Sequence, residues 1–250
     1  MQSFLEQFHF DPSLRRYIGV EREFFLYDPT TAMPVPRSPA FLREVDDPAW
    51  TYELSACQVE HRTTPATTAE SILEHLRTGT DAGMRHARTI SCTLRALEVA
   101  PVAMPLDVYP DARYLALRQH LPTDVLVAAC RVAGTHIHIG MGSIEEAIAV
   151  SNVLRPHIDT LAALGDHSGG ERLRLYRTMS KTWEPPQYET PEHFFTVAIM
   201  RGFADNPRNC YDAIRISTHG TVEVRVFGMT DDAEETLSWI EAIRALIRGT

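Results

Sequence analysis

Three separate segments of the chain each place two charged or metal-binding side chains at spacing two inside an otherwise apolar run. The segments cover residues 17–27, 134–140 and 221–227. Their aromatic and β-branched residues predict β-strands, and residues two apart in a strand point to the same face of a sheet. Each strand is therefore expected to bury one face and to carry ionisable groups on the other.

The side chains on these polar faces are unusual in kind. They are Glu21 and Glu23, then His136 and His138, then Glu223 and Arg225. Taken singly, the pairs also fit a solvated strand face, hydrogen-bonded core histidines and a cross-strand salt bridge. Solvated sheet faces normally mix Thr, Ser and Lys, whereas carboxylates and imidazoles on several strands suit hard cations and a polyphosphate. The flanking Gly134 and Gly140 would leave room for a ligand.

Three further residues are candidates for the same site. Arg215, on the strand that precedes the turn 218–220, could reach the face of Glu223 and Arg225, and two guanidinium groups suit phosphate recognition. Glu53 and Glu60 would add carboxylates. Their spacing of seven puts them on opposite faces of a regular strand, so the segment must loop or bulge between them if both join the site.

The rest of the chain predicts helices around these strands. We expect helices over 69–97, over 144–164 with Gly165 as its end, from Pro191 onwards, and after Asp231–Asp232. Gly79 and Gly83 interrupt the first of these patterns. Further strands are expected over 51–62 and 213–217, and the strand that carries His136 and His138 is expected to span 131–141. A long polar loop is expected over 166–188.

The order of these elements indicates the fold class. A hairpin at 213–227 and helices outside a strict β-α-β alternation predict an α+β fold with a largely antiparallel sheet. The sequence shows no linker-like stretch, which favours a single domain over residues 1–250.

Charge and cysteine content exclude some classes of partner. Lys and Arg number 24 against 33 Asp and Glu, a net charge of −9, which argues against binding to nucleic acid but not against a nucleotide held through metal ions. The four cysteines lie far apart and predict reduced thiols. Without a signal peptide or an apolar stretch of about 20 residues, we expect a cytoplasmic protein with no membrane partner.

Taken together, these motifs resemble the glutamate–cysteine ligase type 2 family of carboxylate–amine ligases, within the glutamine-synthetase-like superfamily. The resemblance rests on residues 19–26, 53–65, 134–140, 214–215 and 220–226, and their order matches that of the family. It implies an open funnel of antiparallel strands with helices packed on its outer face, and ATP with two or three Mg²⁺ ions between the strands.

The resemblance also implies a reaction. A carboxylate, typically the γ-carboxyl of glutamate, attacks the γ-phosphate of ATP, and an amine then attacks the acyl phosphate to give an amide or peptide bond. By this analogy the metal ligands are Glu21, Glu23, Glu53, Glu60, His136 and Glu223.

The same analogy assigns roles to basic residues. Arg225 would contact the transferring phosphoryl group or the acyl phosphate, and forms the catalytic set with Arg215 and Glu223. His138 and Arg215 would lie near the ATP phosphates. Arg172 resembles part of a family loop that closes over the substrate and would also meet phosphate.

Two other functions remain open from the sequence. A shortened, catalytically silent relative would bind nucleotide or an amino acid as a partner subunit, and a metal-dependent hydrolase could use the same cluster to activate water. Typical family members continue well beyond the last predicted helix. We therefore expect a domain shortened at its C-terminus, which forms a homo-oligomer. The amine acceptor is not indicated.

Overall fold

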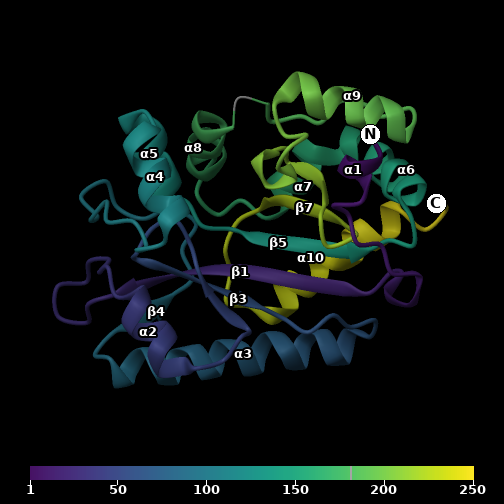
Figure 1. Cartoon of the computed structure of the whole chain (residues 1–250). Helices are drawn as coiled ribbons and strands as arrows, with labels where there is room; N and C mark the ends of the chain where they lie inside the picture. The colour runs from purple at the N-terminus through teal and green to yellow at the C-terminus, as the bar shows by residue number, and fades with distance from the viewer. Residues whose placement is uncertain (181) are drawn as a thin grey trace.

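The computed structural model describes residues 1–180 and 182–250. Its centre is an open sheet with the strand order β2-β3-β1-β5-β7-β6, and β4 also pairs with β1 (Figure 1). The strands are β1 (Ile18–Tyr27), β2 (Trp50–Tyr52), β3 (Gln58–Arg62), β4 (Thr93–Arg95), β5 (Thr135–Gly140), β6 (Ile214–Ser217) and β7 (Thr221–Phe227). All of these pairings are antiparallel, which confirms the predicted fold class.

Helices pack on one face of this sheet and around its ends. The larger ones are α3 (Ala69–Thr89), α6 (Ile144–Leu154), α7 (Ile158–Leu164), α9 (Pro191–Arg201) and α10 (Ala233–Leu246). The shorter ones are α1 (Gln2–Leu5), α2 (Ser38–Val45), α4 (Ala112–His120), α5 (Thr123–Arg131) and α8 (Glu171–Met179), with 3₁₀ turns at Pro12–Leu14, Arg155–His157 and Pro207–Asn209. Helices α4, α5 and α8 stand together beyond one end of the sheet, at the left of Figure 1. None of the described helices has the length and apolar character that a bilayer crossing requires.

The apolar faces of the strands and helices meet as the sequence predicts. Val222, Val224 and Val226 are all buried, and the neighbouring Phe227 stacks on Trp239 of α10 with ring centroids 4.9 Å apart. Ile240 and Ile243 of α10 are buried, as is Ile247 directly after the helix. This layer leaves the opposite face of the sheet to the ionisable side chains.

Several element boundaries differ from the predictions. The helix expected over 69–97 ends at Thr89, because β4 then pairs with β1. The helix expected over 144–164 is divided into α6 and α7 by a 3₁₀ turn that contains Pro156, which cannot donate a helical hydrogen bond. The strand expected over 131–141 begins only at Thr135, because 123–131 form α5.

The polar segment 166–188, predicted as a loop, contains α8. Gly169 and Gly170 have φ angles of 63° and 85°, and the Asp166 carboxylate accepts the backbone N–H groups of Ser168 and Gly170. These contacts form a turn that leads directly into the helix, so the glycines begin a helix here. Lys181, within the predicted loop, lies outside the described residues.

Candidate metal and phosphate site

Strand register brings the predicted polar pairs together on one face of the sheet. The opposing residues, from β3 across to β6, are Glu60 with Glu23, Glu21 with His136, His138 with Glu223, and Glu223 with Arg215. Paired residues of adjacent strands have Cα atoms roughly 4.5–5.5 Å apart, so these side chains are forced into contact. The structure therefore places every sequence-predicted metal ligand on these strands in one cluster.

Glu53 joins this cluster because the segment 51–62 is not one strand. It forms β2 and β3 with a turn between them. Gln58, the first residue after the turn, fixes its end, because the side-chain amide of Gln58 donates to the Val132 carbonyl at 2.5 Å. Carboxylate oxygens of Glu23, Glu53 and Glu60 consequently lie within 4.8 Å of one another. The loop that the sequence required between Glu53 and Glu60 is present.

Three overlapping groups of possible metal ligands result from this arrangement. In each group one oxygen or nitrogen atom per residue lies within 4.8 Å of the others; the groups are Glu23–Glu53–Glu60, Glu21–Glu60–His136 and Glu21–His138–Glu223. Glu60 belongs to the first two groups and Glu21 to the last two, so neighbouring groups adjoin one another across the sheet. Oxygen-rich ligand sets of this kind suit Mg²⁺.

Three of the carboxyl groups resist ionisation in this environment. Burial and the neighbouring Glu53 raise the pKa of Glu23 to about 8. Burial and the charge of Glu21 raise the pKa of Glu60 well above its usual range, and burial likewise raises the pKa of Glu53. Like charges this close repel each other unless a cation lies between them. The cluster is therefore electrostatically incomplete without positive charge.

The other half of the cluster is already compensated. Burial opposes ionisation of Glu21, but His138 and His136 outweigh it and hold the pKa of this carboxyl well below its usual range. Glu223 is also buried, and Arg215 and Arg225 lower its pKa. Burial and the Arg225 charge lower the pKa of His136 to about 4, so its imidazole is neutral at pH 7 and able to bind a metal.

His138 has one ring nitrogen directed into the cluster. Its Nδ1 lies 2.8 Å from the Thr221 hydroxyl. Its buried Nε2 has no hydrogen-bond partner among the described residues, and lies 3.3 Å from a Glu21 carboxylate oxygen and 3.9 Å from one of Glu223. Burial alone would lower the pKa of His138, but the two carboxylates raise it.

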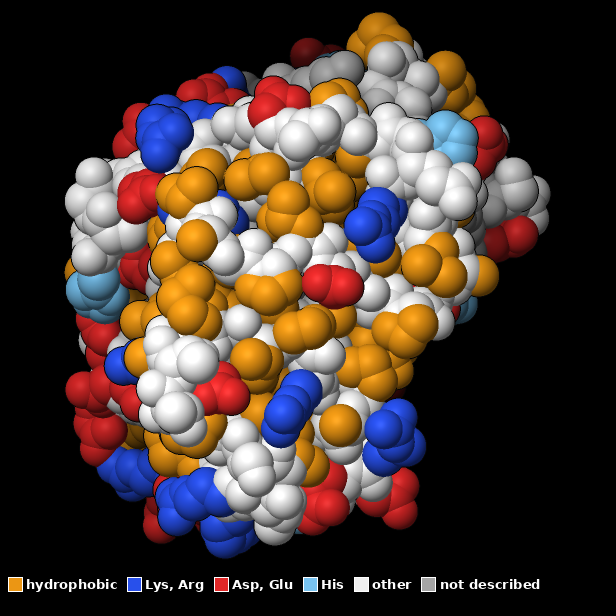
Figure 2. Space-filling model, turned by 90° about the vertical axis from the view of Figure 1, so that its left-hand side faces the viewer, with side chains coloured by type: hydrophobic (Ala, Val, Ile, Leu, Met, Phe, Trp, Pro, Cys, Tyr) orange, Lys and Arg blue, Asp and Glu red, His pale blue; other side chains and the backbone are white. Residues whose placement is uncertain are grey.

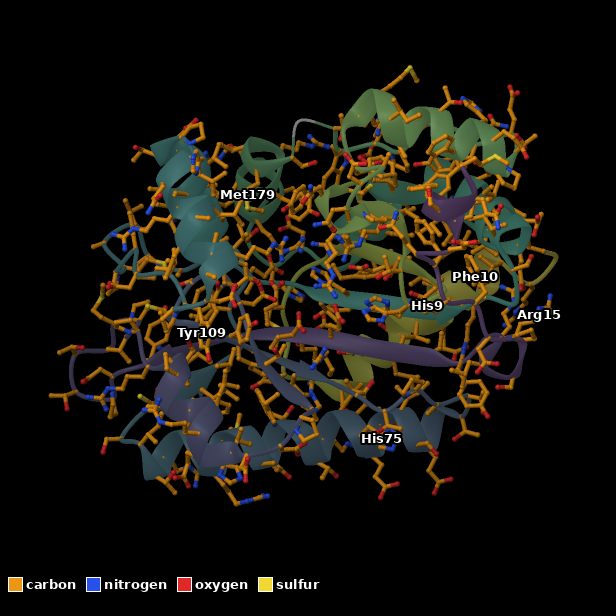
Figure 3. The ribbon with its side chains drawn as sticks, in the orientation of Figure 1. His9, Phe10, Arg15, His75, Tyr109 and Met179 are labelled. Atoms are coloured by element: carbon orange, nitrogen blue, oxygen red, sulfur yellow. The ribbon has the colours of Figure 1, made fainter. Side chains whose placement is uncertain are left out.

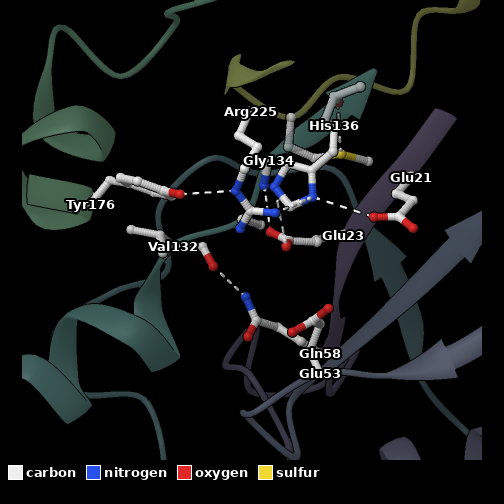
Figure 4. A network of polar contacts seen from close by, with 12 residues as sticks. Glu21, Glu23, Glu53, Gln58, Val132, Gly134, His136, Tyr176 and Arg225 are labelled. Atoms are coloured by element: carbon white, nitrogen blue, oxygen red, sulfur yellow. Dashed lines mark hydrogen bonds and ion pairs between the residues drawn. The ribbon is translucent and has the colours of Figure 1, made fainter. Parts of the chain in front are cut away.

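Two arginines converge on Glu223 from adjacent strands. Arg215 Nε donates to Glu223 Oε2 at 2.5 Å, and Arg225 Nη1 donates to the other carboxylate oxygen. Arg225 Nε also donates to the Tyr176 hydroxyl at 3.0 Å (Figure 4). These bonds fix two guanidinium groups beside the carboxylate cluster, an arrangement that suits phosphate recognition.

Sequence reasoning missed Tyr176. It lies on α8, in the segment predicted as a loop, so no face could be assigned to it. The only available signal was its spacing of four from Arg172, which puts both residues on one side of a helix. The Arg172 guanidinium carbon in fact lies 5.9 Å from the centre of the Tyr176 ring.

Arg172 makes structural contacts that the sequence did not indicate. Its guanidinium donates to the backbone carbonyls of Ala133, Val226 and Arg225 at 2.8, 2.9 and 3.2 Å. It therefore ties α8 to the ends of β5 and β7. Arg172 also lines the cavity over the cluster, and its contact with phosphate stays a prediction.

Two cavities adjoin the cluster. The larger, of about 440 Å³, lies over Glu23, Glu53 and Glu60 and also reaches Arg225. The smaller, of about 290 Å³, lies beside His138. Glu21, Arg62 and His219 line both cavities. The cluster thus separates two spaces that approach the same ionisable groups from different sides.

Comparison with known proteins gives consistent results. The model of glutamate-cysteine ligase family 2 matches residues 17–250. A Mycolicibacterium smegmatis protein with the provisional name glutamate–cysteine ligase 2-3 is 30% identical over 92% of this chain and 67% of its own length. A Natronomonas pharaonis glutamate–cysteine ligase is 26% identical over 92% of this chain and 68% of its own length.

The chain is shorter than these relatives. It spans 58% of a Paenarthrobacter aurescens protein, also provisionally named glutamate–cysteine ligase 2-3, with 28% identity over 93% of this chain. Among solved structures, the bifunctional glutathione synthetase of Pasteurella multocida matches 92% of this chain and 39% of its own, with a TM-score of 0.57 and 12% identity. Plasmodium falciparum glutamine synthetase matches 94% and 52%, with a TM-score of 0.52 and 11% identity. The similarity to these two solved structures is a similarity of fold alone.

Proposed function

The chain belongs to glutamate-cysteine ligase family 2, and on this premise we propose that it is an ATP- and Mg²⁺-dependent carboxylate–amine ligase that acts on the γ-carboxyl of glutamate. The family and its named relatives support a ligase. The nucleotide, the metal, the acyl phosphate, the substrates, a cytoplasmic location and a homo-oligomeric state are parts of the proposal.

One observation carries the proposal: a set of carboxylates that needs cations lies next to two fixed arginines. Glu23, Glu53 and Glu60 have raised pKa values because they are buried among like charges, while Arg215 and Arg225 converge on Glu223. Cations and guanidinium groups together neutralise the charge that moves during phosphoryl transfer. Plain hydrolysis would not call for the two arginines.

The residues present fit Mg²⁺. Glu23, Glu53 and Glu60 form an all-carboxylate group, and the unpartnered Nε2 of His138 faces Glu21 and Glu223 in a second group. His136 lies between them, with Nδ1 3.6 Å from Glu21 and Nε2 3.7 Å from Glu23. When held by these residues, Mg²⁺ would offset the negative charge of the phosphates.

The proposed first step forms an acyl phosphate. A carboxylate oxygen of the substrate bonds to the γ-phosphorus of ATP, the bond from that phosphorus to the bridging oxygen breaks, and ADP leaves. Arg225, held by Tyr176 and Glu223, stabilises the charge on the transferring group without needing to reorient. Arg215 and His138 contact the phosphates of the nucleotide.

In the second step the amine attacks the acyl carbon. The new C–N bond forms, the carbon–oxygen bond to phosphate breaks, and the departing phosphate takes the proton that the amine loses. The two cavities that meet at Glu21 support entry of the nucleotide from the His138 side and of the other substrates from the Glu53 side. Holding the reactants in line in this way accounts for much of the rate enhancement in such reactions.

The test is a turnover assay with a matched pair of variants. We would incubate the protein with ATP, Mg²⁺, glutamate and a panel of amines and measure ADP and phosphate release. Release should require glutamate and an amine together. Glu60→Gln should reduce kcat/KM by at least about 100-fold, because even loss of a residue that only supports a metal ligand typically costs about 10–100-fold. Glu70→Gln on the exposed first turn of α3 should leave kcat/KM unchanged.

Other results would contradict the proposal. Nucleotide binding without turnover on any amine would indicate the silent relative. Cleavage of an amide without ATP would indicate the hydrolase. A Glu60→Gln variant as active as the wild type would refute the site assignment.

A further inference from the structure

The cavity over the carboxylates has an apolar wall that the proposed chemistry does not use. Helices α4, α5 and α8 and the turn after α4 supply this wall; its residues are Tyr114, Leu117, Leu121, Val125, Ala129 and Met179. Figure 3 shows Met179 on α8, next to α4 and α5. Hydrophobic side chains also gather on the face of the molecule that carries these helices (Figure 2). The cavity is thus charged at the sheet and largely apolar along α4 and α5, where Arg113 is the charged residue of the lining, while α8 adds Arg172.

The apolar side of α4 does not pack against the hydrophobic core. None of its residues is fully buried, although Tyr114 and Leu117 are both half-buried and lie three residues apart on one side of the helix. Both line the cavity. While this apolar stripe is exposed to water, the protein does not gain the free energy that burying it would give. A ligand with an apolar part would recover it by filling the cavity.

Tyr114 connects the wall to the carboxylate cluster. Its ring packs edge-on against Tyr52 of β2, with centroids 5.8 Å apart. Burial and the negative charge of the nearby Glu53 raise the pKa of its hydroxyl. The apolar wall therefore begins where the carboxylates end, so one ligand can contact both.

The position of the wall distinguishes between the substrates. Of the proposed phosphate contacts, His138 on β5 lines the second cavity, and Arg215 lines the larger cavity from β6, at the opposite edge of the sheet from β2. The wall adjoins Glu53 at the opposite end of the cluster. Glutamate has only two methylene groups between its charged ends and would gain little from this wall. The amine is the remaining substrate that could fill it.

We propose that this wall binds the side chain of the acceptor, and that the acceptor is an amine with an aliphatic or aromatic side chain. The inference rests on the proposed ligase function and names the substrate class for its second step. Each buried methylene of the acceptor should raise kcat/KM about fourfold, so the gain accumulates with side-chain size.

The test compares a graded series of amino acids as acceptors. With ATP, Mg²⁺ and glutamate fixed, kcat/KM from ADP release should rise from alanine through valine to leucine and phenylalanine, by tenfold or more between alanine and leucine. Leu117→Ser should remove most of this gradient while the KM for ATP stays constant. Leu115→Ser is the matched control, because Leu115 is on the same helix, 45% exposed and outside the cavity lining.

The possible outcomes separate the two proposals. ADP release that needs an amine but is equal across the series, or fastest with cysteine, overturns the apolar acceptor and leaves the ligase intact. No release with any amine overturns both. If Leu117→Ser raises the KM for ATP, the wall binds the adenine ring. If the variant keeps its acceptor selectivity but light scattering shows that a dimer is lost, the wall binds a second copy of the chain. If Leu117→Ser fails to fold, Val125→Ser on α5 tests the same wall.

Discussion

Glu21 and Glu23 lie two residues apart on the same face of β1, yet their carboxyl groups shift in opposite directions. His138 and His136 overcome the effect of burial and hold the pKa of Glu21 low. Burial and Glu53 raise the pKa of Glu23 to about 8. The difference follows from the neighbouring strands, because β5 supplies imidazoles beside Glu21 while β3 and the turn before it supply carboxylates beside Glu23.

This difference predicts a pH-dependent proton release when metal binds. At pH 7 Glu23 is mostly protonated and must lose its proton to act as a ligand, whereas at pH 9 it is already ionised. Mn²⁺ or Mg²⁺ binding should therefore release more protons at pH 7 than at pH 9, and apparent affinity should fall as the pH drops below about 8. Calorimetry in buffers of different ionisation enthalpy measures the release. Equal release at both pH values would contradict the assignment.

At the scale of elements, α3 shows why a helix can contain two glycines. A Cβ atom on Gly79 would overlap the His61 ring, and one on Gly83 would overlap Trp50. Both aromatic residues lie on the strands beneath the helix. The glycines that weaken the helical pattern in the sequence are therefore the residues that let α3 approach the sheet closely.

This packing predicts the effect of adding one methyl group. Gly→Ala in a helix usually stabilises by about 1 kcal/mol, but Gly79→Ala should destabilise the protein by about 1–3 kcal/mol because the methyl group displaces His61. Urea unfolding measures the change.

The control is the same substitution in a His61→Ala background. Removing the ring should abolish the penalty and restore the ordinary gain from Ala, which a double-mutant cycle detects as coupling between the two sites. An equal loss of stability in both backgrounds would show that the clash is not with His61.

Helix α8 is a second case in which tertiary contacts define an element. Its sequence is polar and follows a Gly-Gly pair, so local pattern indicates a loop. In the structure Arg172 fastens it to three backbone carbonyls of the sheet, and it packs against α5. Carbonyl acceptors carry no sequence signal, and the helix was therefore not predictable.

At the scale of the whole molecule, the sheet gathers five carboxylates from four different segments into one face. These are Glu21, Glu23, Glu53, Glu60 and Glu223. Strands that converge on like charges repel one another, so the folded state carries a cost that a bound cation offsets. Stability of the whole protein should consequently depend on divalent metal.

We expect Mg²⁺ to raise the melting temperature of the protein. At a concentration 100 times its Kd, a ligand that binds only the folded state adds about 2.7 kcal/mol, or about 5–10 °C for a chain of this size. EDTA should reverse the shift, and NaCl of equal ionic strength should not reproduce it. Differential scanning calorimetry measures the effect. A Glu60→Gln variant with the full Mg²⁺ shift would contradict the site.

The sequence by itself determined the polar face and the fold class. Because residues two apart in a strand point to the same face, Glu21 shares a face with Glu23, and Glu223 with Arg225, in any tertiary context. The order of elements predicts an antiparallel sheet. Tertiary structure decided which pairs meet, since register depends on how strands align across long loops. It also decided the charge state of each carboxyl and the roles of Tyr176 and Arg172, because burial and distant neighbours set these properties and neither is encoded in local pattern.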